Sequence, residues 1–382
     1  MSTLLRLTAR TALALSMLGA VSFGQNYQQT NLVSSEAGVA PVTDSDLINP
    51  WGISRGSGSP WWISNNAKGI ANLFDGAGTK LGLVVTIPAA ASGKQGSPTG
   101  TIFNGSSTDF LLAPGAQAIF LFCTIDGTIA GWNPAVGLTT GMMPPSTHAV
   151  TVVKGKKGSV YTGLTSAFID GKRYLYAANF GKGRVDVYDS AFHRVGFGEE
   201  RFDDDQLPPD YVPFNVQTIG NDIVVTYALH EEGHIFETDG PGLGYVVVYS
   251  SKGRLLLRLQ HGDWLNAPWG VALAPLDFGR FSHDLLVGQF AGAGTTESSG
   301  WIAAYNLTTG HFDGLLQDAA GKPIAINGIW ALSSGNASPN NYDAASAPGA
   351  EVYFTAGPKG QTEGLFGYLT AVPTELIQGN DQ

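Results

Sequence analysis

The chain has 382 residues, of which 43% are hydrophobic and 14% are charged. This composition excludes a disordered chain, because disorder requires few apolar residues and a high net charge. The formal net charge of −10 argues against nucleic acid and anionic membrane surfaces as partners, since both repel an acidic surface.

The first 24 residues have the pattern of a secretory signal peptide. Arg6 and Arg10 give it a positive start, residues 11–23 are uncharged and largely apolar, and small residues suit cleavage after Ser22 or Gly24. The apolar stretch is shorter than the roughly 20 residues that a membrane-spanning helix needs, and no later stretch is apolar enough to span a membrane. We therefore expect a secreted or periplasmic protein, in which residues 25–382 form one domain with a flexible end at 373–382.

Residues 27–34 are the first strand-like segment, and a repeat follows them. In this repeat a glycine, four mostly small or β-branched residues and an aromatic residue recur, with the aromatic residues 56 to 63 positions apart. The aromatic residues are Phe74, Trp132, Tyr188, Tyr249, Tyr305 and, in a weaker copy, Tyr368. Each copy predicts a strand entered through a glycine turn, and we expect the aromatic residues of the first five copies to be buried between neighbouring units. The single cysteine, Cys123, lies in an apolar run of the second unit and is also expected to be buried.

Each repeat unit opens with a short strand, usually with a glycine near its start. The predicted opening strands lie near residues 50–54, 98–103, 161–167, 213–219, 268–274 and 326–332. Glycine fits the innermost position of a ring, where backbones crowd around the axis. Four strands per unit and six units predict an all-β fold, namely a six-bladed β-propeller with four-stranded antiparallel blades. Residues 27–34 would then complete the sixth blade; the alternative, a linear array of six sheets, leaves blade edges exposed.

Three segments carry a family resemblance: NPWGIS at residues 49–54, PFNVQ at 213–217 and VTYA at 225–228. They resemble an uncharacterised family of secreted bacterial β-propeller proteins, some of which carry a Pro-Glu-Pro sorting tail at the C-terminus. The resemblance covers roughly residues 27–372 and implies the fold and export, but no activity. This chain ends in TAVPTELIQGNDQ, without such a tail. More distantly, the repeat is similar to NHL-type and gluconolactonase-type propellers.

Loops that enter the inner strands and loops that leave the second strands share one face of a propeller, which we call the upper face. There the sequence places a ring of amide and indole side chains, which are suited to bind hydroxyl groups and to stack on sugar rings. The candidate ligand-binding residues are Asn49, Trp51, Asn65, Asn66, Asn179, Asn215, Trp269, Gln289, Asn327 and Trp330. The alternative is structural, because Asn at strand ends commonly bonds to the neighbouring backbone and Trp near the axis is core.

Residues 230–234 (HEEGH) match the H-E-x-x-H spacing of zinc proteases, in which a helix presents both histidines on one side. Here the motif follows a strand and contains Gly233, so we expect a loop and not a protease site. A second acidic loop precedes the fourth blade, and carboxylate-rich clusters suit calcium. The candidate metal ligands are Asp203, Asp204, Asp205, His230, Glu231 and His234.

The sequence leaves three functions open. The first is an exported module, expected to be a monomer, that binds a small molecule, glycan or protein through the upper face. The second is a metal-dependent hydrolase or lactonase on the same face. The third is a structural component of the envelope or matrix. Lactonase-type propellers hold an ion with carboxylates near the axis, and the opening strands here lack them.

Overall fold

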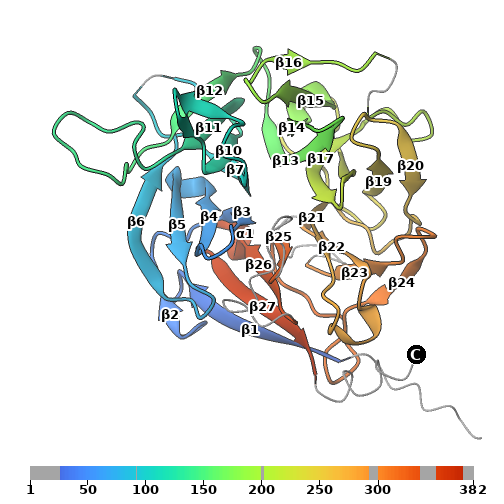
Figure 1. Cartoon of the computed structure of the whole chain (residues 1–382). Helices are drawn as coiled ribbons and strands as arrows, with labels where there is room; N and C mark the ends of the chain where they lie inside the picture. The colour runs from blue at the N-terminus through green and yellow to red at the C-terminus, as the bar shows by residue number, and fades with distance from the viewer. Residues whose placement is uncertain (1–25, 92, 199–201, 292–299, 336–349, 373–382) are drawn as a thin grey trace, which may run out of the picture.

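The fold is a closed ring of six β-sheets, seen in a computed structural model that describes residues 26–91, 93–198, 202–291, 300–335 and 350–372 (Figure 1). This confirms the predicted six-bladed β-propeller with four-stranded antiparallel blades. The predicted signal peptide and the predicted flexible end lie outside the described residues.

Each blade has four strands, and the first strand lies nearest the axis. From the inner strand outward, blade one consists of β3 (Pro50–Ser54), β4 (Trp61–Asn65), β5 (Ile70–Phe74) and β6 (Lys80–Thr86). Blade two consists of β7 (Pro98–Phe103), β10 (Phe120–Thr124), β11 (Thr128–Trp132) and β12 (Val150–Lys154). Blade three consists of β13 (Tyr161–Ile169), β14 (Lys172–Asn179), β15 (Arg184–Asp189) and β16 (Arg194–Val195). Blade four consists of β17 (Tyr211–Ile219), β18 (Asp222–Leu229), β19 (Tyr245–Tyr249) and β20 (Leu255–Arg258). Blade five consists of β21 (Pro268–Leu273), β22 (Leu285–Gln289), β23 (Ile302–Tyr305) and β24 (Phe312–Leu315). Blade six consists of β25 (Ile329–Ser334), β26 (Val352–Ala356), β27 (Leu365–Ala371) and β1 (Tyr27–Ser34).

Other elements are short. β2 (Val42–Thr43) runs parallel to β1, and β8 (Leu111–Ala113) pairs with β9 (Ala116–Gln117) in a hairpin beside blade two. The helical elements of the described residues are η1 (Asn66–Lys68), η2 (Phe180–Lys182), η3 (Gly279–Phe281) and α1 (Pro358–Gln361). None of these is long and apolar enough to cross a membrane.

The ring is closed by the N-terminal strand, as the sequence predicted. β1 pairs antiparallel with β27, from Tyr27 opposite Ala371 to Ser34 opposite Leu365. The Tyr27 ring stacks on Phe281, and its hydroxyl donates a hydrogen bond to the Phe278 carbonyl oxygen at 3.0 Å. The first strand therefore links blade six to blade five as well as the two ends of the propeller.

Every inner strand contains a β-bulge near its start, directly after the first residue in five blades and after Pro213, the third residue of β17, in blade four. A bulge inserts an extra residue and changes the direction in which the side chain points. The bulges begin at Trp51, Thr99, Thr162, Phe214, Trp269 and Trp330. Four of the six are aromatic, and these four rings are buried together in one core cluster.

Small residues follow the bulge because neighbouring inner strands touch. A Cβ atom added to Gly100 in β7 would lie 2.6 Å from the backbone nitrogen of Leu164 in β13. The comparable residue of blade six is Ala331, after Ile329 and Trp330. The predicted opening of this blade was therefore placed three residues early, because the Asn327-Gly328 pair resembles the glycine motif of the other blades.

The repeat aromatic residues are buried, as predicted, and pack between blades. They are Phe74, Trp132, Tyr188, Tyr249 and Tyr305. The Phe74 ring of blade one lies 5.9 Å from the Phe366 ring of blade six, and the Trp132 ring of blade two lies 4.7 Å from the Trp62 ring of blade one. Cys123 is also buried as predicted, and burial raises the pKa of its thiol to about 12.

Candidate functional site

A central cavity of about 260 Å³ lies where the six inner strands end, and all six contribute to its wall. We call this end of the axis the lower end, opposite the upper face at which the inner strands begin. Apolar side chains make up part of the wall; they include Ile53, Ile102, Phe103, Val271 and Leu332. The inner strands thus build a pocket with a substantial apolar surface.

Hydroxyl and amide groups make up most of the remaining wall. They belong to Ser54, Thr165, Ser166, Gln217, Thr218, Ser333 and Ser334. Some of these groups are fixed by hydrogen bonds: the hydroxyls of Thr165 and Thr218 lie 2.8 Å apart, and Thr218 also donates to the Ser166 carbonyl oxygen at 2.9 Å. Two neighbouring blades therefore hold a fixed set of small polar groups at the cavity.

Toward the upper face the cavity narrows to an extension of about 20 Å³, bordered by Asn215, Gln217 and Trp269. Room of this size holds about one water molecule. Asn215 occupies the position at which Gly52, Gly100, Gly163 and Gly270 stand in other blades, and its amide donates to the Trp269 carbonyl oxygen at 2.7 Å. The polar side chain of blade four thus forms the floor of the cavity.

Beyond that floor lie the residues that the sequence singled out for ligand binding. Nine of the ten have exposed fractions of at most 9%; only Asn327 is exposed. The Trp51 and Trp330 rings stack with centroids 3.5 Å apart, and Phe290 stacks on the other side of Trp330 at 3.8 Å. These rings close the axis at the upper face and leave no open basin among themselves, because the bulges turn them inward.

Most of the amides in this group bond to nearby protein atoms. Asn49 accepts a hydrogen bond from Trp330 Nε1 at 2.8 Å, and Asn179 Nδ2 donates to Asp186 at 2.6 Å. Asn65 differs, because its amide is buried and has no hydrogen-bond partner among the described residues. Of the ten predicted residues, Asn215 and Trp269 border the small extension of about 20 Å³ and none lines the main cavity; a role of these ten residues in binding stays a prediction.

The proposed metal ligands are not gathered at one point. Asp204 is buried and forms a bidentate ion pair with Arg258, at 2.5 and 2.6 Å, while its neighbours Asp203 and Asp205 are exposed. Arg258 holds the pKa of Asp204 below its usual value. Among the residues that the structure describes, no three His, Cys, Asp or Glu side chains are grouped as a metal site requires.

The H-E-x-x-H segment forms a loop between β18 and β19, as expected. The His230 ring packs at a tilt against Phe180, with ring centroids 4.6 Å apart, and its Nε2 lies 3.0 Å from the His234 carbonyl oxygen. Glu231 accepts a hydrogen bond from Thr238 at 2.8 Å. This arrangement is a turn held by its own polar contacts and not a helical zinc motif.

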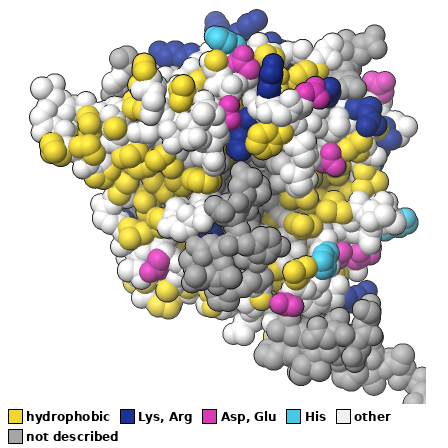
Figure 2. Space-filling model, viewed as in Figure 1, with side chains coloured by type: hydrophobic (Ala, Val, Ile, Leu, Met, Phe, Trp, Pro, Cys, Tyr) yellow, Lys and Arg dark blue, Asp and Glu magenta, His cyan; other side chains and the backbone are white. Residues whose placement is uncertain are grey.

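Sequence reasoning missed the lower end of the axis. A signal was present: in blades one, three, four and six, Ser or Thr recurs four or five residues after the residue that precedes the bulge, at Ser54, Thr165, Thr218 and Ser333. On the face drawn in Figure 2, basic and acidic side chains lie interspersed, so the charges of this face give no further guide to a site.

Comparisons with known proteins agree with the fold. No family model matches the chain. The uncharacterised protein L690 of Acanthamoeba polyphaga mimivirus is 30% identical over 347 residues, which cover 88% of this chain and 84% of the relative.

Two solved structures share the propeller. One is a structural genomics protein of unknown function from Bacteroides thetaiotaomicron VPI-5482, with a TM-score of 0.51, 10% identity and coverage of 90% of this chain and 76% of that chain. The other is the PQQ-bound form of aldose sugar dehydrogenase from Streptomyces coelicolor, with a TM-score of 0.50, 12% identity and coverage of 91% and 98%. At these identities, the likeness shows the fold alone.

Proposed function

Because the chain belongs to the family of the mimivirus protein L690, whose name states no activity, we propose a function from the geometry of this chain: it is an exported module that binds a small organic molecule in its central cavity. The observation that carries the proposal is the cavity at the lower end, to which all six inner strands contribute. Concave, partly apolar pockets with a few fixed polar groups are the usual form of small-molecule sites.

The size of the cavity limits the ligand. Its volume of about 260 Å³ lies between the roughly 150 Å³ of a cavity that holds benzene and the roughly 300 Å³ at which pockets for drug-sized ligands begin. A ligand that fits is therefore a small metabolite with one ring or a short chain. A glycan chain or a protein segment is too large to be enclosed.

Binding is favoured over hydrolysis by the chemistry of the lining. The lining residues that the structure describes offer hydroxyls, amides and the Arg55 guanidinium, but no Asp, Glu or His. A metal-dependent hydrolase or lactonase uses such groups to hold the ion and to transfer protons. A purely structural role in an envelope or matrix gives no reason for the cavity.

Export is the part of the proposal that rests on the sequence. The positive start and the apolar stretch of residues 1–24 support it. Expression in a bacterial host, followed by fractionation and N-terminal sequencing, tests it. We expect a mature chain that begins at Phe23 or Gln25 outside the cytoplasm; an intact N-terminus in the cytoplasmic fraction would contradict export.

Blocking the cavity tests the binding site. Compounds that co-purify with the protein are identified by native mass spectrometry, and their affinities are measured by titration calorimetry. Ser333→Phe fills the cavity from β25, whereas Thr308→Phe adds the same bulk to an exposed turn after β23 and serves as the control. We expect Ser333→Phe to weaken binding about tenfold or more while Thr308→Phe binds like the wild type. Equal affinity of the two variants would place the ligand elsewhere.

A further inference from the structure

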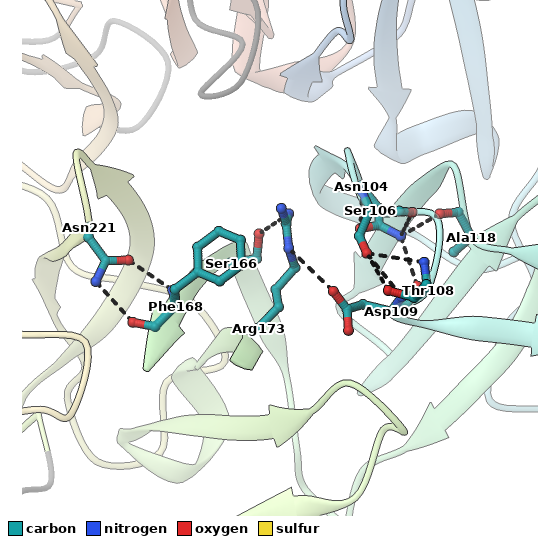
Figure 3. Close-up of polar contacts among 9 residues, drawn as sticks. All are labelled: Asn104, Ser106, Thr108, Asp109, Ala118, Ser166, Phe168, Arg173 and Asn221. Carbon is teal, nitrogen blue, oxygen red and sulfur yellow. Dashed lines mark hydrogen bonds and ion pairs between the residues drawn. The ribbon is translucent and has the colours of Figure 1, made fainter. Parts of the chain in front are cut away.

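A buried arginine lies beside the central cavity. Arg173 in β14 has an exposed fraction of 6%, and its guanidinium covers the ring of Phe168 at 4.6 Å. Its Nη1 lies 3.5 Å from the hydroxyl oxygen of Ser166, which lines the cavity. Figure 3 shows the guanidinium between Phe168 and Asp109, directly next to Ser166. The cation is therefore one small side chain away from the proposed ligand.

The charge of Arg173 is only partly compensated. A guanidinium has five N–H donors, yet the hydrogen bond to Ser166 is long, and the ion pair from Nε to the Asp109 carboxylate spans 3.9 Å. Nε has no hydrogen-bond partner among the described residues. Burial lowers the pKa of Arg173, and Asp109 opposes this only in part. A buried cation in this state gains from an anion with better geometry.

Asp109 is held in place at this distance. The Asn104 amide donates to the carbonyl oxygens of Asp109 and Ala118 at 3.1 and 2.8 Å, and the Ser106 hydroxyl accepts from the Asp109 backbone N–H at 3.0 Å. The same network is drawn in Figure 3. The loop before β8 therefore fixes the backbone of Asp109 beside the cation, and its carboxylate forms no short ion pair with Arg173.

The aromatic platform is fixed as well. The Asn221 amide of blade four receives the Phe168 N–H at 2.8 Å and donates to the Phe168 carbonyl oxygen at 2.9 Å. Phe168 and Asp109, the two neighbours of the Arg173 guanidinium, are thus held by residues outside β14. Preorganisation of this kind reduces the entropy that binding costs.

The cavity itself is cationic although the chain is acidic. Its described lining contains one charged residue, Arg55, whose guanidinium covers the Trp61 ring at 5.2 Å. With Arg173 behind Ser166, blades one and three each bring one cation to the cavity. The formal net charge of the whole chain is −10, so the charge of these two arginines is opposite in sign to that of the chain as a whole.

We propose that the cavity is selective for small organic anions, and that Arg173 recognises their carboxylate or phosphate group while the apolar wall covers the rest of the molecule. This inference rests on the proposed function, because it names the class of ligand for the same cavity. In the proposed complex, the anion approaches past Ser166 and supplies the short charge-assisted hydrogen bonds that Asp109 does not make. Arg173 is then the residue that determines specificity.

Three probes with one ring each test the inference. Benzoate and phenyl phosphate carry an anionic group, and benzyl alcohol is their neutral counterpart. Titration calorimetry at low ionic strength should give an affinity for at least one anion about tenfold or more above that for benzyl alcohol. If benzyl alcohol binds as well as both anions, the anion inference is overturned while the cavity remains a binding site. If none of the three probes binds, the inference that the cavity selects small ring-bearing anions is overturned. The proposal that the cavity binds some other small molecule is a separate one, and this result does not decide it.

Variants identify the residue responsible. Arg173→Met keeps the aliphatic stem but removes the charge, and it should reduce the preference for anions to near the level of benzyl alcohol. Arg173→Lys should keep part of the preference. Arg194→Met, which removes an exposed arginine paired with Asp186 far from the cavity, is the control and should bind like the wild type. If a folded Arg173→Met protein still prefers anions, Arg173 is excluded as the anion-recognising residue. If Arg173→Met does not fold, Ser166→Ala is tested in its place, because this substitution opens the path from the cavity to the guanidinium. An anion preference that Ser166→Ala leaves equal or stronger supports the inference, and its loss there overturns it.

Discussion

Backbone contact at the axis makes single glycines decisive for stability. In Gly100→Ala the new methyl group meets the backbone of the next inner strand, where the ideal Cβ lies 2.6 Å from the Leu164 nitrogen. Gly82 in β6 has no atom near its Cβ position and is the matched control. We expect Gly100→Ala to lower the free energy of unfolding by about 1–3 kcal/mol, and Gly82→Ala to change it by about 0.5 kcal/mol or less. Urea unfolding of both variants measures the difference; equal stabilities would show that the inner strands separate easily.

Asp204, one of the predicted metal ligands, is held by an ion pair with Arg258 instead. Arg258 keeps the pKa of Asp204 low in the folded protein, so the pair stabilises the fold above the usual aspartate pKa of about 3.9 and loses its effect as the pH falls through the lower folded value. Asp204→Asn should therefore cost about 1–2 kcal/mol near pH 7, since Arg258 is partly exposed, and much less near pH 3. Asp205→Asn, an exposed neighbour, is the control.

Urea unfolding at the two pH values measures both variants. A loss that stays constant down to pH 3 would mean that the charge of Asp204 is not the cause. A rise in melting temperature with calcium that Asp204→Asn abolishes would restore the metal interpretation.

Among the elements, β1 contributes most to closure because it completes a blade made from the opposite end of the chain. Its buried side chains include Tyr27, Leu32 and Val33, each worth about 1.5–3 kcal/mol of burial. A variant without residues 1–34 should lose most of its stability, which is about 5–15 kcal/mol for typical proteins. Circular dichroism melting and gel filtration measure the loss, and a variant without residues 1–25, which keeps all of β1, is the control.

If the shorter chain is insoluble, a synthetic peptide of residues 26–34 added during refolding should restore the folded protein. An unchanged melting temperature after removal of β1 would contradict the role of this strand.

The inner strands show why elements were easier to predict than the site they build. The glycine and aromatic spacing of the repeat follows from strand and turn chemistry, so blade number, closure and the buried aromatic residues could be read from the sequence. The bulge near the start of each inner strand, in contrast, leaves no spacing pattern in the sequence. It turns Trp51 and Trp330 inward, and the sequence therefore placed an open basin where the structure has packed rings.

At the scale of the whole molecule, the sequence could not predict contacts between segments that are far apart along the chain. Asp204 and Arg258 are 54 residues apart in the sequence, and Arg173 meets Asp109 from the neighbouring blade. Local patterns specify neither contact, because each depends on how blades are placed around the ring. The cavity has the same origin: its hydroxyl residues resemble ordinary strand residues until six strand ends come together.

Ring closure by β1 also sets the order of events while the chain is made. β1 leaves the ribosome before every other described strand, but its partner β27 leaves last, since Tyr27 pairs with Ala371. During synthesis β1 has no partner strand until β27 has been made, and an unpaired strand edge favours aggregation. If the chain is exported unfolded, as proposed above, both ends reach the same compartment before the ring closes. A chain cut short before β27 then carries an open sixth blade, which distinguishes it from a finished ring and exposes it to proteases.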